Sequence, residues 1–186
     1  MQTRNADRWE MNNTNLALFV IDMQNCWLHP KGIAYNSRLR VVPAVRSAIS
    51  FARKAGIQII YLYTAYKKDL SDAGVYPDLG LYKGRMFDAK ENWSLFEGTE
   101  GTKIIDEVAP TNKDIVIKKM RYSGFIGTEL ETILRESGLN TIVISGISSN
   151  VCCESTARDG MMLNFRVVFL SDCTATRSLA ANILPL

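Results

Sequence analysis

The sequence contains only one histidine, His29, in the segment WLHPKG. Mechanisms that activate a serine or cysteine through histidine therefore fit this chain only if His29 reaches the reacting group from its loop. None of the four cysteines has the C-x-x-C spacing, and they stand at Cys26, Cys152, Cys153 and Cys173. This pattern is typical neither of a secreted disulfide framework nor of a zinc site, so we expect reduced thiols, no metal and no cofactor.

The chain also lacks a strong charge and a long apolar run. Its formal net charge is +3 and its basic residues are scattered, which favours a small-molecule substrate and predicts no nucleic-acid and no membrane partner. No apolar run is long enough to span a bilayer, and the polar beginning MQTRNADRWEMNNTN lacks the apolar stretch of a secretion signal. We therefore predict a cytoplasmic protein.

With 186 residues, 47% of them hydrophobic, the chain can bury one sizeable core. We predict a single domain over residues 1–186, in which residues 1–13 form a polar extension. Apolar runs alternate with amphipathic segments. The predicted strands cover residues 16–24, 57–65, 114–120, 141–147 and 166–172. Helices are predicted within residues 40–57, 102–110, 130–138 and 151–164, and the tail is predicted to begin a final helix.

Local signals mark the ends of two of these helices. Pro43 suits a first helical turn and Gly56 a helix stop. Thr128 and Glu131 predict a capping box before LETILRESG, which Gly138 ends. The alternation of strands and helices predicts an α/β fold, a Rossmann-like three-layer α/β/α sandwich with an open parallel sheet. Ligands of such sheets bind outside the carboxyl ends of the strands.

Polar residues stand at three of these strand ends. Asp22 follows the apolar run ALFVI, Lys118 and Lys119 end the third strand, and the loop SSNVCC follows the fourth. A carboxylate inside an apolar run is costly to bury without a partner, so we expect a lysine beside Asp22. On spacing alone an alternative stays open, in which Asp22 caps a loop and both lysines are solvated.

The adjacent cysteines are predicted to differ in role. Cys152 lies where the helix after strand four begins, and the positive end of a helix lowers a thiol pKa. Cys153 points about 100° further around the helix and is expected to pack as a small apolar group. A disulfide between adjacent cysteines is strained, and a metal site built on this pair needs more ligands than the chain supplies.

These residues resemble a known family, the isochorismatase-like cysteine hydrolases. The matching motifs are VIDMQN with Asp22, KKMRYSGF with Lys119 and GISSNVC with Cys152, and the resemblance runs from about residue 14 to 176. RYSGF-x-x-T-x-L and SNVCCESTARDG are most similar to the ureidoacrylate amidohydrolase and carbamoyl-hydrolase branch. In that branch the lysine lies two residues before the arginine, which selects Lys119 over Lys118.

The resemblance implies a strand order of 3-2-1-4-5, a homodimer or homotetramer, and a Cys-Asp-Lys triad that cleaves a C–N bond through a thioester. It also implies a cis peptide between Ile147 and Ser148 that turns the N–H of Ser148, together with that of Cys152, toward the oxyanion. Metal-binding members carry histidines after strand two, whereas YLYTAYKKD contains none. Members usually continue further at the C-terminus, so the C-terminal element is expected to be shortened.

Substrate contacts are expected from residues near the strand ends: Asn25, Thr64, Tyr66 and Tyr122, with Trp93 as a further candidate. Packing is the alternative role for the aromatic ones. Two other functions stay open. One is a catalytically silent binding or scaffold subunit of the same fold, and the other is a redox sensor that uses Cys152 and Cys153.

Overall fold

The structure is a computed structural model that describes residues 12–31, 39–75, 87–88, 90 and 92–176. Its centre is one five-stranded sheet in which every neighbouring pair of strands is parallel. The strand order, β3-β2-β1-β4-β5, confirms the predicted order. The strands are β1 (Leu16–Ile21), β2 (Gln58–Thr64), β3 (Ile115–Lys119), β4 (Thr141–Ile147) and β5 (Arg166–Ala175).

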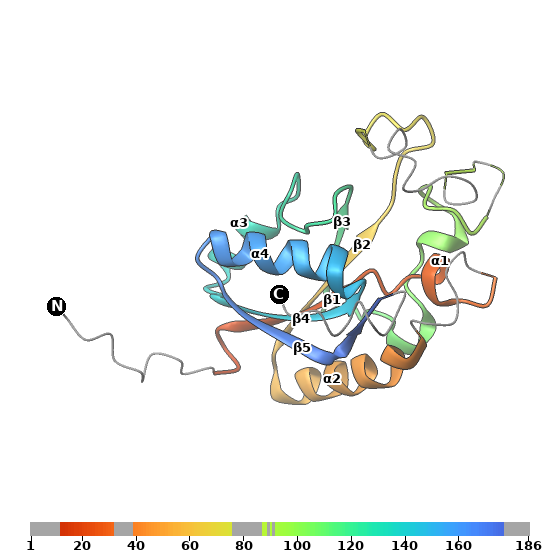
Figure 1. Ribbon diagram of the computed structural model, residues 1–186. Coiled ribbons are helices and arrows are strands. Elements are labelled where there is room, and N and C mark those ends of the chain that lie inside the picture. The colour runs from red at the N-terminus through yellow and green to blue at the C-terminus, as the bar shows by residue number, and fades with distance from the viewer. Residues whose placement is uncertain (1–11, 32–38, 76–86, 89, 91, 177–186) are drawn as a thin grey trace.

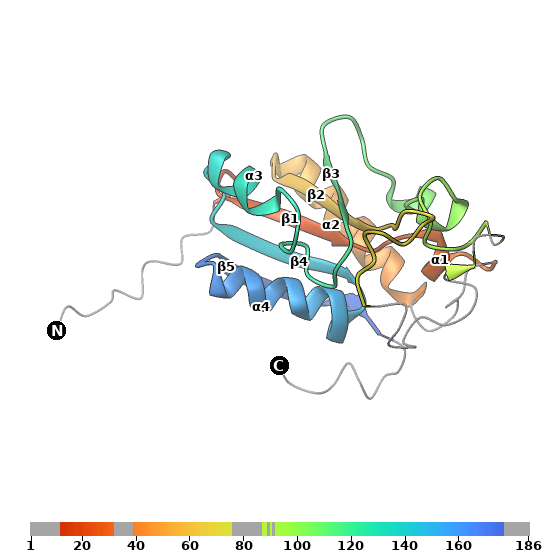
Figure 2. The same ribbon diagram turned by 90° about the horizontal axis from the view of Figure 1, so that it is seen from above.

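Helices cover both faces of the sheet, so the predicted three-layer sandwich is confirmed (Figure 1). Helices α3 (Leu130–Glu136) and α4 (Glu154–Met162) lie on one face, and α2 (Val42–Ala55) lies on the other. Seen from above, α4 runs alongside β4 and β5 (Figure 2). The short α1 (Asn25–Leu28) lies beyond the carboxyl end of β1.

The apolar run of β1 is unbroken because both of its faces are buried. Phe19 and Ile21 join the core beneath α3 and α4, whereas Leu18 and Val20 join the core beneath α2. Alternate side chains of a strand point to opposite faces, so a central strand between two helical layers needs apolar residues at every position. This central place brings Asp22, the next residue, to the middle of the sheet's carboxyl edge.

The predicted ends of α2 are confirmed, as is the helix stop at Gly138 after α3, whereas the capping box before α3 is not. Pro43 lies in the first turn of α2, and Gly56 ends it with a φ of 71° in the left-handed region. Before α3, Thr128 Oγ1 accepts a 3.2 Å hydrogen bond from the N–H of Leu130, but Glu131 does not complete a capping box. Its carboxylate instead pairs with Arg135 one turn later, at 2.8 Å.

Other element boundaries shift by a few residues. β1 ends at Ile21 rather than residue 24, because Asp22 takes a φ of 51° and turns the chain out of the strand. The segment predicted as a helix at 102–110 forms two 3₁₀ turns instead, at Glu100–Thr102 and Asp106–Val108. The helix that carries Cys152 begins two residues early with the π-helical turn Ser149–Cys153. The predicted final helix and the C-terminal shortening fall on residues 177–186, outside the described ones.

The end of β4 lies against β1 with no room for a side chain. Gly146 has a φ of 111°, and a Cβ added there would lie 2.1 Å from the carbonyl oxygen of Ile21. This contact brings the loop after β4, and with it Cys152, close to the residue that follows β1. Within the described ranges, no helix has the length and apolarity needed to cross a membrane.

Candidate active site

The carboxyl edge of the sheet holds a buried ion pair. Asp22 follows β1 and Lys119 is the last residue of β3, and the distance from Lys119 Nζ to Asp22 Oδ2 is 2.9 Å. Their side chains are 4% and 0% exposed, respectively. Burial without a partner would be costly for either charge, so each supplies the counter-charge that the other needs.

The neighbouring lysine faces away from this pair. Lys118 pairs with Asp72 at 3.2 Å and with Glu97 at 2.6 Å. Arg121 donates a 3.0 Å hydrogen bond to the Asp72 carbonyl, so both basic residues hold the segment that follows β2. Adjacent strand residues point to opposite faces, and therefore only Lys119 of the two is directed at Asp22.

Thr64, the last residue of β2, lies between the two charged residues. Its hydroxyl donates to Asp22 Oδ1 at 2.9 Å and accepts from Lys119 Nζ at 2.8 Å. Lys119 also donates to the carbonyl of Arg121 at 3.2 Å. The three N–H groups of the ammonium thus have three acceptors. Thr64 is one of the predicted substrate contacts, and in the structure its hydroxyl is part of the network that holds the ion pair.

Cys152 completes the cluster from the helical turn after β4. Its thiol lies beside Asp22 and Lys119, and both charged groups act on the pKa of this thiol. Burial and the Asp22 charge raise the pKa of Cys152 to about 12, against a smaller lowering by Lys119. The expected depression of this pKa by the helix N-terminus is therefore wrong. Desolvation and an adjacent carboxylate both disfavour the thiolate, and they outweigh the dipole of one helix end.

Lys119 remains charged in this setting. Burial alone lowers the pKa of its ammonium, but Asp22, through its charge and its hydrogen bond, outweighs burial and raises it. The resting cluster therefore contains a carboxylate, an ammonium and a neutral thiol that already contacts its proton acceptor.

Cys153 has the packing role predicted for it. It is fully buried in the core that Phe125 and Ala157 also join. Burial raises its pKa well above the ordinary thiol value. Cys152 and Cys153 are both free thiols, so the first is available for chemistry and the second is part of the fold.

The loop between β4 and the helix is held from two sides. The peptide bond between Ile147 and Ser148 is cis. The Ser148 carbonyl accepts hydrogen bonds from the N–H groups of Val151 and Cys153, at 3.1 and 3.2 Å. Thr156 donates to the Cys152 carbonyl at 2.7 Å and accepts from the N–H of Gly124 at 3.0 Å. Thr156 thereby joins the RYSGF segment to the helix that carries Cys152.

Gln24 is a site residue that sequence reasoning missed. It is fully buried. Its side-chain oxygen accepts from the Thr64 N–H at 2.8 Å, and its nitrogen donates to the carbonyls of Thr64 and Thr102 at 2.8 and 3.0 Å. The signal in the sequence was an amide directly after a buried apolar run, within VIDMQN. Gln24 and Thr156 both act on the backbone of a residue that belongs to the cluster.

The other predicted substrate contacts lie in different surroundings. Asn25 uses its side-chain amide to donate to the Glu100 carbonyl at 3.1 Å. Tyr66 is buried in an aromatic cluster with Phe87, at 5.3 Å between ring centroids. Tyr122 is half-buried in the segment after β3.

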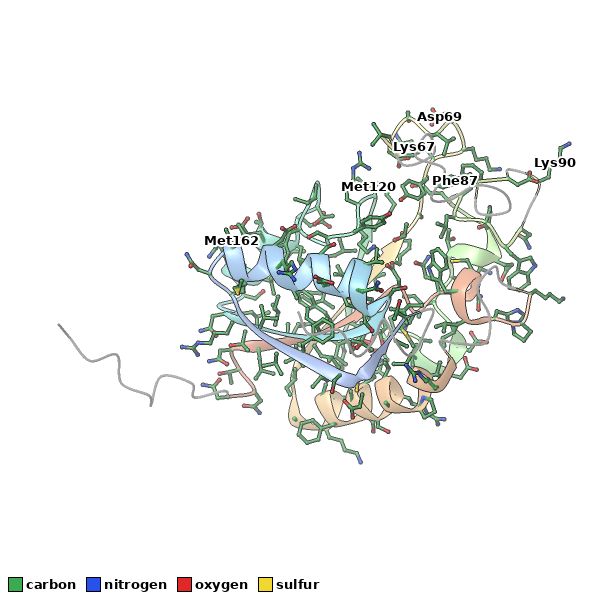
Figure 3. All side chains as sticks on the ribbon, in the orientation of Figure 1. Lys67, Asp69, Phe87, Lys90, Met120 and Met162 are labelled. Carbon is green, nitrogen blue, oxygen red and sulfur yellow. The ribbon has the colours of Figure 1, made fainter. Side chains whose placement is uncertain are left out.

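Several aromatic residues and His29 pack against each other outside this cluster. Figure 3 shows Phe87 and Met120 beyond the ends of β2 and β3, on the side of the molecule opposite Met162. Trp93 stacks on His29, with ring centroids 4.4 Å apart. Within the part of the chain that is described, no group of three or more His, Cys, Asp and Glu side chains is arranged to hold a metal ion.

Comparison with known proteins shows the family to which the chain belongs. A family model described as the isochorismatase domain matches residues 16–182. The chain belongs to the isochorismatase family. The ureidoacrylate amidohydrolase RutB of Stutzerimonas stutzeri is 34% identical over 176 residues, covering 88% of this chain and 71% of the relative. The predicted family resemblance is confirmed, and the protein is an enzyme of a hydrolase family.

Solved structures share the fold. A cysteine hydrolase from Pseudomonas syringae pv. phaseolicola is 33% identical with a TM-score of 0.79, and the match covers 91% of this chain and 76% of that one. N-carbamoylsarcosine amidase from Thermoplasma acidophilum is 29% identical with a TM-score of 0.74, covering 88% and 85%, respectively. The solved relatives of this isochorismatase-family enzyme thus include one named as a cysteine hydrolase and one named as an amidase.

Proposed function

We propose that this enzyme is a cysteine-dependent amidohydrolase that cleaves a C–N bond of a small amide, ureide or carbamoyl compound. The observation that supports the proposal is the contact of one thiol with a buried carboxylate and a buried ammonium, Cys152 with Asp22 and Lys119. A neutral thiol beside a carboxylate can lose its proton at the moment of attack, which is how an adjacent base activates a nucleophile.

The first half-reaction forms a thioester. Cys152 Sγ attacks the carbonyl carbon while its proton passes to Asp22, and the carbonyl oxygen becomes an oxyanion. The N–H groups of Ser148 and Cys152 are assigned to this oxyanion. The tetrahedral intermediate collapses as Asp22 gives the proton to the leaving nitrogen. For a terminal ureido group this step releases ammonia and leaves the carbamoyl group on sulfur.

The second half-reaction restores the enzyme. Asp22, again a carboxylate, takes a proton from water, whose oxygen attacks the thioester carbon. The C–S bond breaks, the sulfur recovers the proton, and the product leaves as an acid or a carbamate. Lys119 keeps its positive charge throughout, because its three N–H groups are already engaged. Its role in this scheme is to stabilise the negative charge as it moves between Asp22, sulfur and the oxyanion.

The relatives suggest which compounds to test first. One is named for ureidoacrylate and another for N-carbamoylsarcosine. Both names denote the same chemical group, a carbamoyl group attached to a nitrogen atom. We propose this group as the reacting part of the substrate, and Asn25, Tyr66 and Tyr122 as the residues that surround the rest of it.

Ammonia release from ureidoacrylate, N-carbamoylsarcosine and simple amides tests the proposal. The wild type is expected to release ammonia, Cys152→Ala to release none, and Cys153→Ala to remain active. An inactive wild type with every compound would instead favour a binding or scaffold subunit of the same fold. Equal loss in both cysteine variants would contradict the assignment of Cys152 as the nucleophile.

A further inference from the structure

We propose that Thr64 is a positioning residue, whose hydroxyl holds the Asp22 carboxylate in the orientation that receives the Cys152 proton. This inference rests on the proposed amidohydrolase function. Thr64 touches neither the reacting sulfur nor substrate in the proposal. It acts through Asp22 and Lys119, which it joins with two hydrogen bonds.

Chemistry fixes the direction of both hydrogen bonds. An ammonium can only donate, so the 2.8 Å contact from Lys119 Nζ uses a lone pair of Thr64 Oγ1. A carboxylate can only accept, so the single hydroxyl hydrogen of Thr64 is directed to Asp22 Oδ1, at 2.9 Å. The hydroxyl therefore has one orientation while the ion pair is charged, and it ties the carboxylate to β2.

The two carboxylate oxygens of Asp22 are thereby held by different strands. Oδ1 accepts from Thr64 on β2, and Oδ2 is 2.9 Å from Lys119 on β3. A carboxylate with one fixed donor on each oxygen resists rotation about its terminal bond. The remaining lone pairs stay available to the thiol of Cys152. Rates of proton transfer depend on such alignment, because a small misplacement of a catalytic group slows the reaction strongly.

Thr64 is itself fixed through its backbone. Gln24 accepts from its N–H and donates to its carbonyl, both at 2.8 Å. In the sheet, Thr64 pairs with Lys119 on the neighbouring strand. Its hydroxyl can therefore be removed without loss of the backbone that carries it. Valine has nearly the same shape as threonine, so Thr64→Val removes the two side-chain hydrogen bonds and little else.

The split between kcat and KM distinguishes positioning from substrate contact. Thr64→Val removes none of the charged groups beside Asp22 and leaves Lys119 on β3 in place. It removes only the hydroxyl that holds the carboxylate, so kcat is expected to fall while KM stays nearly the same.

The experiment compares Thr64→Val, Thr64→Ser and the control Thr141→Val, with the carbamoyl compound that the wild type hydrolyses. Thr141 is a buried threonine at the other end of the sheet, where its hydroxyl contacts only Asn140 in the described network. For Thr64→Val we expect kcat to fall by about 10–100-fold with KM within about 3-fold, as for loss of one aligned catalytic hydrogen bond. Thr64→Ser is expected to recover most of kcat, and Thr141→Val to keep it.

Three results would overturn the proposal. An increase of KM at unchanged kcat would make Thr64 a substrate contact, and equal effects of Thr64→Val and Thr141→Val would make it a packing residue. A Thr64→Ser variant that recovers none of the lost kcat would remove the link between the hydroxyl and Asp22. If the wild type hydrolyses nothing, the proposed function fails separately. Crystal structures then decide, because the proposal expects Asp22 to rotate in Thr64→Val and to return in Thr64→Ser.

Discussion

Replacing Asp22 by asparagine is expected to make Cys152 more reactive while abolishing hydrolysis. The substitution keeps the shape of the side chain and removes its negative charge and its ability to accept a full proton. Burial is the largest cause that raises the pKa of Cys152 to about 12, and the charge of Asp22 is the second. Without that charge, the remaining partner of the thiol is Lys119, which favours the thiolate.

The size of the effect follows from Coulomb's law. Two unit charges about 4 Å apart interact by about 4 kcal/mol at an effective dielectric constant of about 20, which corresponds to roughly three pKa units. Part of this is lost if Lys119 becomes neutral without its carboxylate partner. We therefore expect the pKa of Cys152 to fall by about two units, so that the thiolate fraction at pH 8 rises about 100-fold.

Alkylation by iodoacetamide measures this fraction. The rate is followed by intact mass between pH 6 and 11 for wild type and Asp22→Asn, and Cys152→Ala identifies the contribution of the other three thiols. For wild type the rate should still be rising above pH 10, whereas Asp22→Asn should alkylate faster at pH 8. Asp72→Asn is the matched control, because it removes the same charge from the pair with Lys118.

This mechanism predicts that Asp22→Asn raises the rate of alkylation and abolishes turnover. A carboxylate too far from the thiol to take its proton would leave the thiol pKa unchanged when replaced by an amide. The reasoning is refuted if Asp22→Asn alkylates no faster than wild type at pH 8, or if it keeps more than a few per cent of turnover. A faster reaction in Asp72→Asn as well would indicate a general effect of charge.

Three further variants test the structure around the site. Cys153→Ala is expected to lower the free energy of unfolding by about 1 kcal/mol, measured with urea, and to keep turnover within a few-fold, because it removes only packing. Gln24→Leu leaves the buried N–H and carbonyl of Thr64 without their partners and should lower the free energy of unfolding by about 2–4 kcal/mol in the same assay. An unchanged urea midpoint would contradict this role of Gln24. Gly146→Ala should abolish folding, judged by soluble yield and circular dichroism, since its Cβ would overlap β1. The control Gly138→Ala has space around its Cβ, so it should cost only the strain of placing alanine at a left-handed φ of 68°, about 1–2 kcal/mol.

The sequence alone predicted the architecture and most of the element positions. The periods of apolar residues are local properties, and a central strand such as Leu16–Ile21 must be apolar on both faces wherever it lies in such a sheet. The topology then brings the residues after β1, β2, β3 and β4 to one edge. For that reason Asp22, Lys119 and the cysteine loop could be named as neighbours before any coordinates. The choice of Lys119 over Lys118 came from the family motif and not from periodicity.

Only the tertiary structure decided what these neighbours do to each other. The thiol pKa of Cys152 was predicted to fall from a local feature, the helix N-terminus, but it rises because burial and Asp22 act across the sheet. Thr64 was assigned to substrate, yet its hydroxyl is used between Asp22 and Lys119. Gln24 was missed because its partners are 40 and 78 residues away in sequence. Burial and hydrogen-bond partners depend on contacts between distant segments, and such contacts exist only once the sheet is assembled.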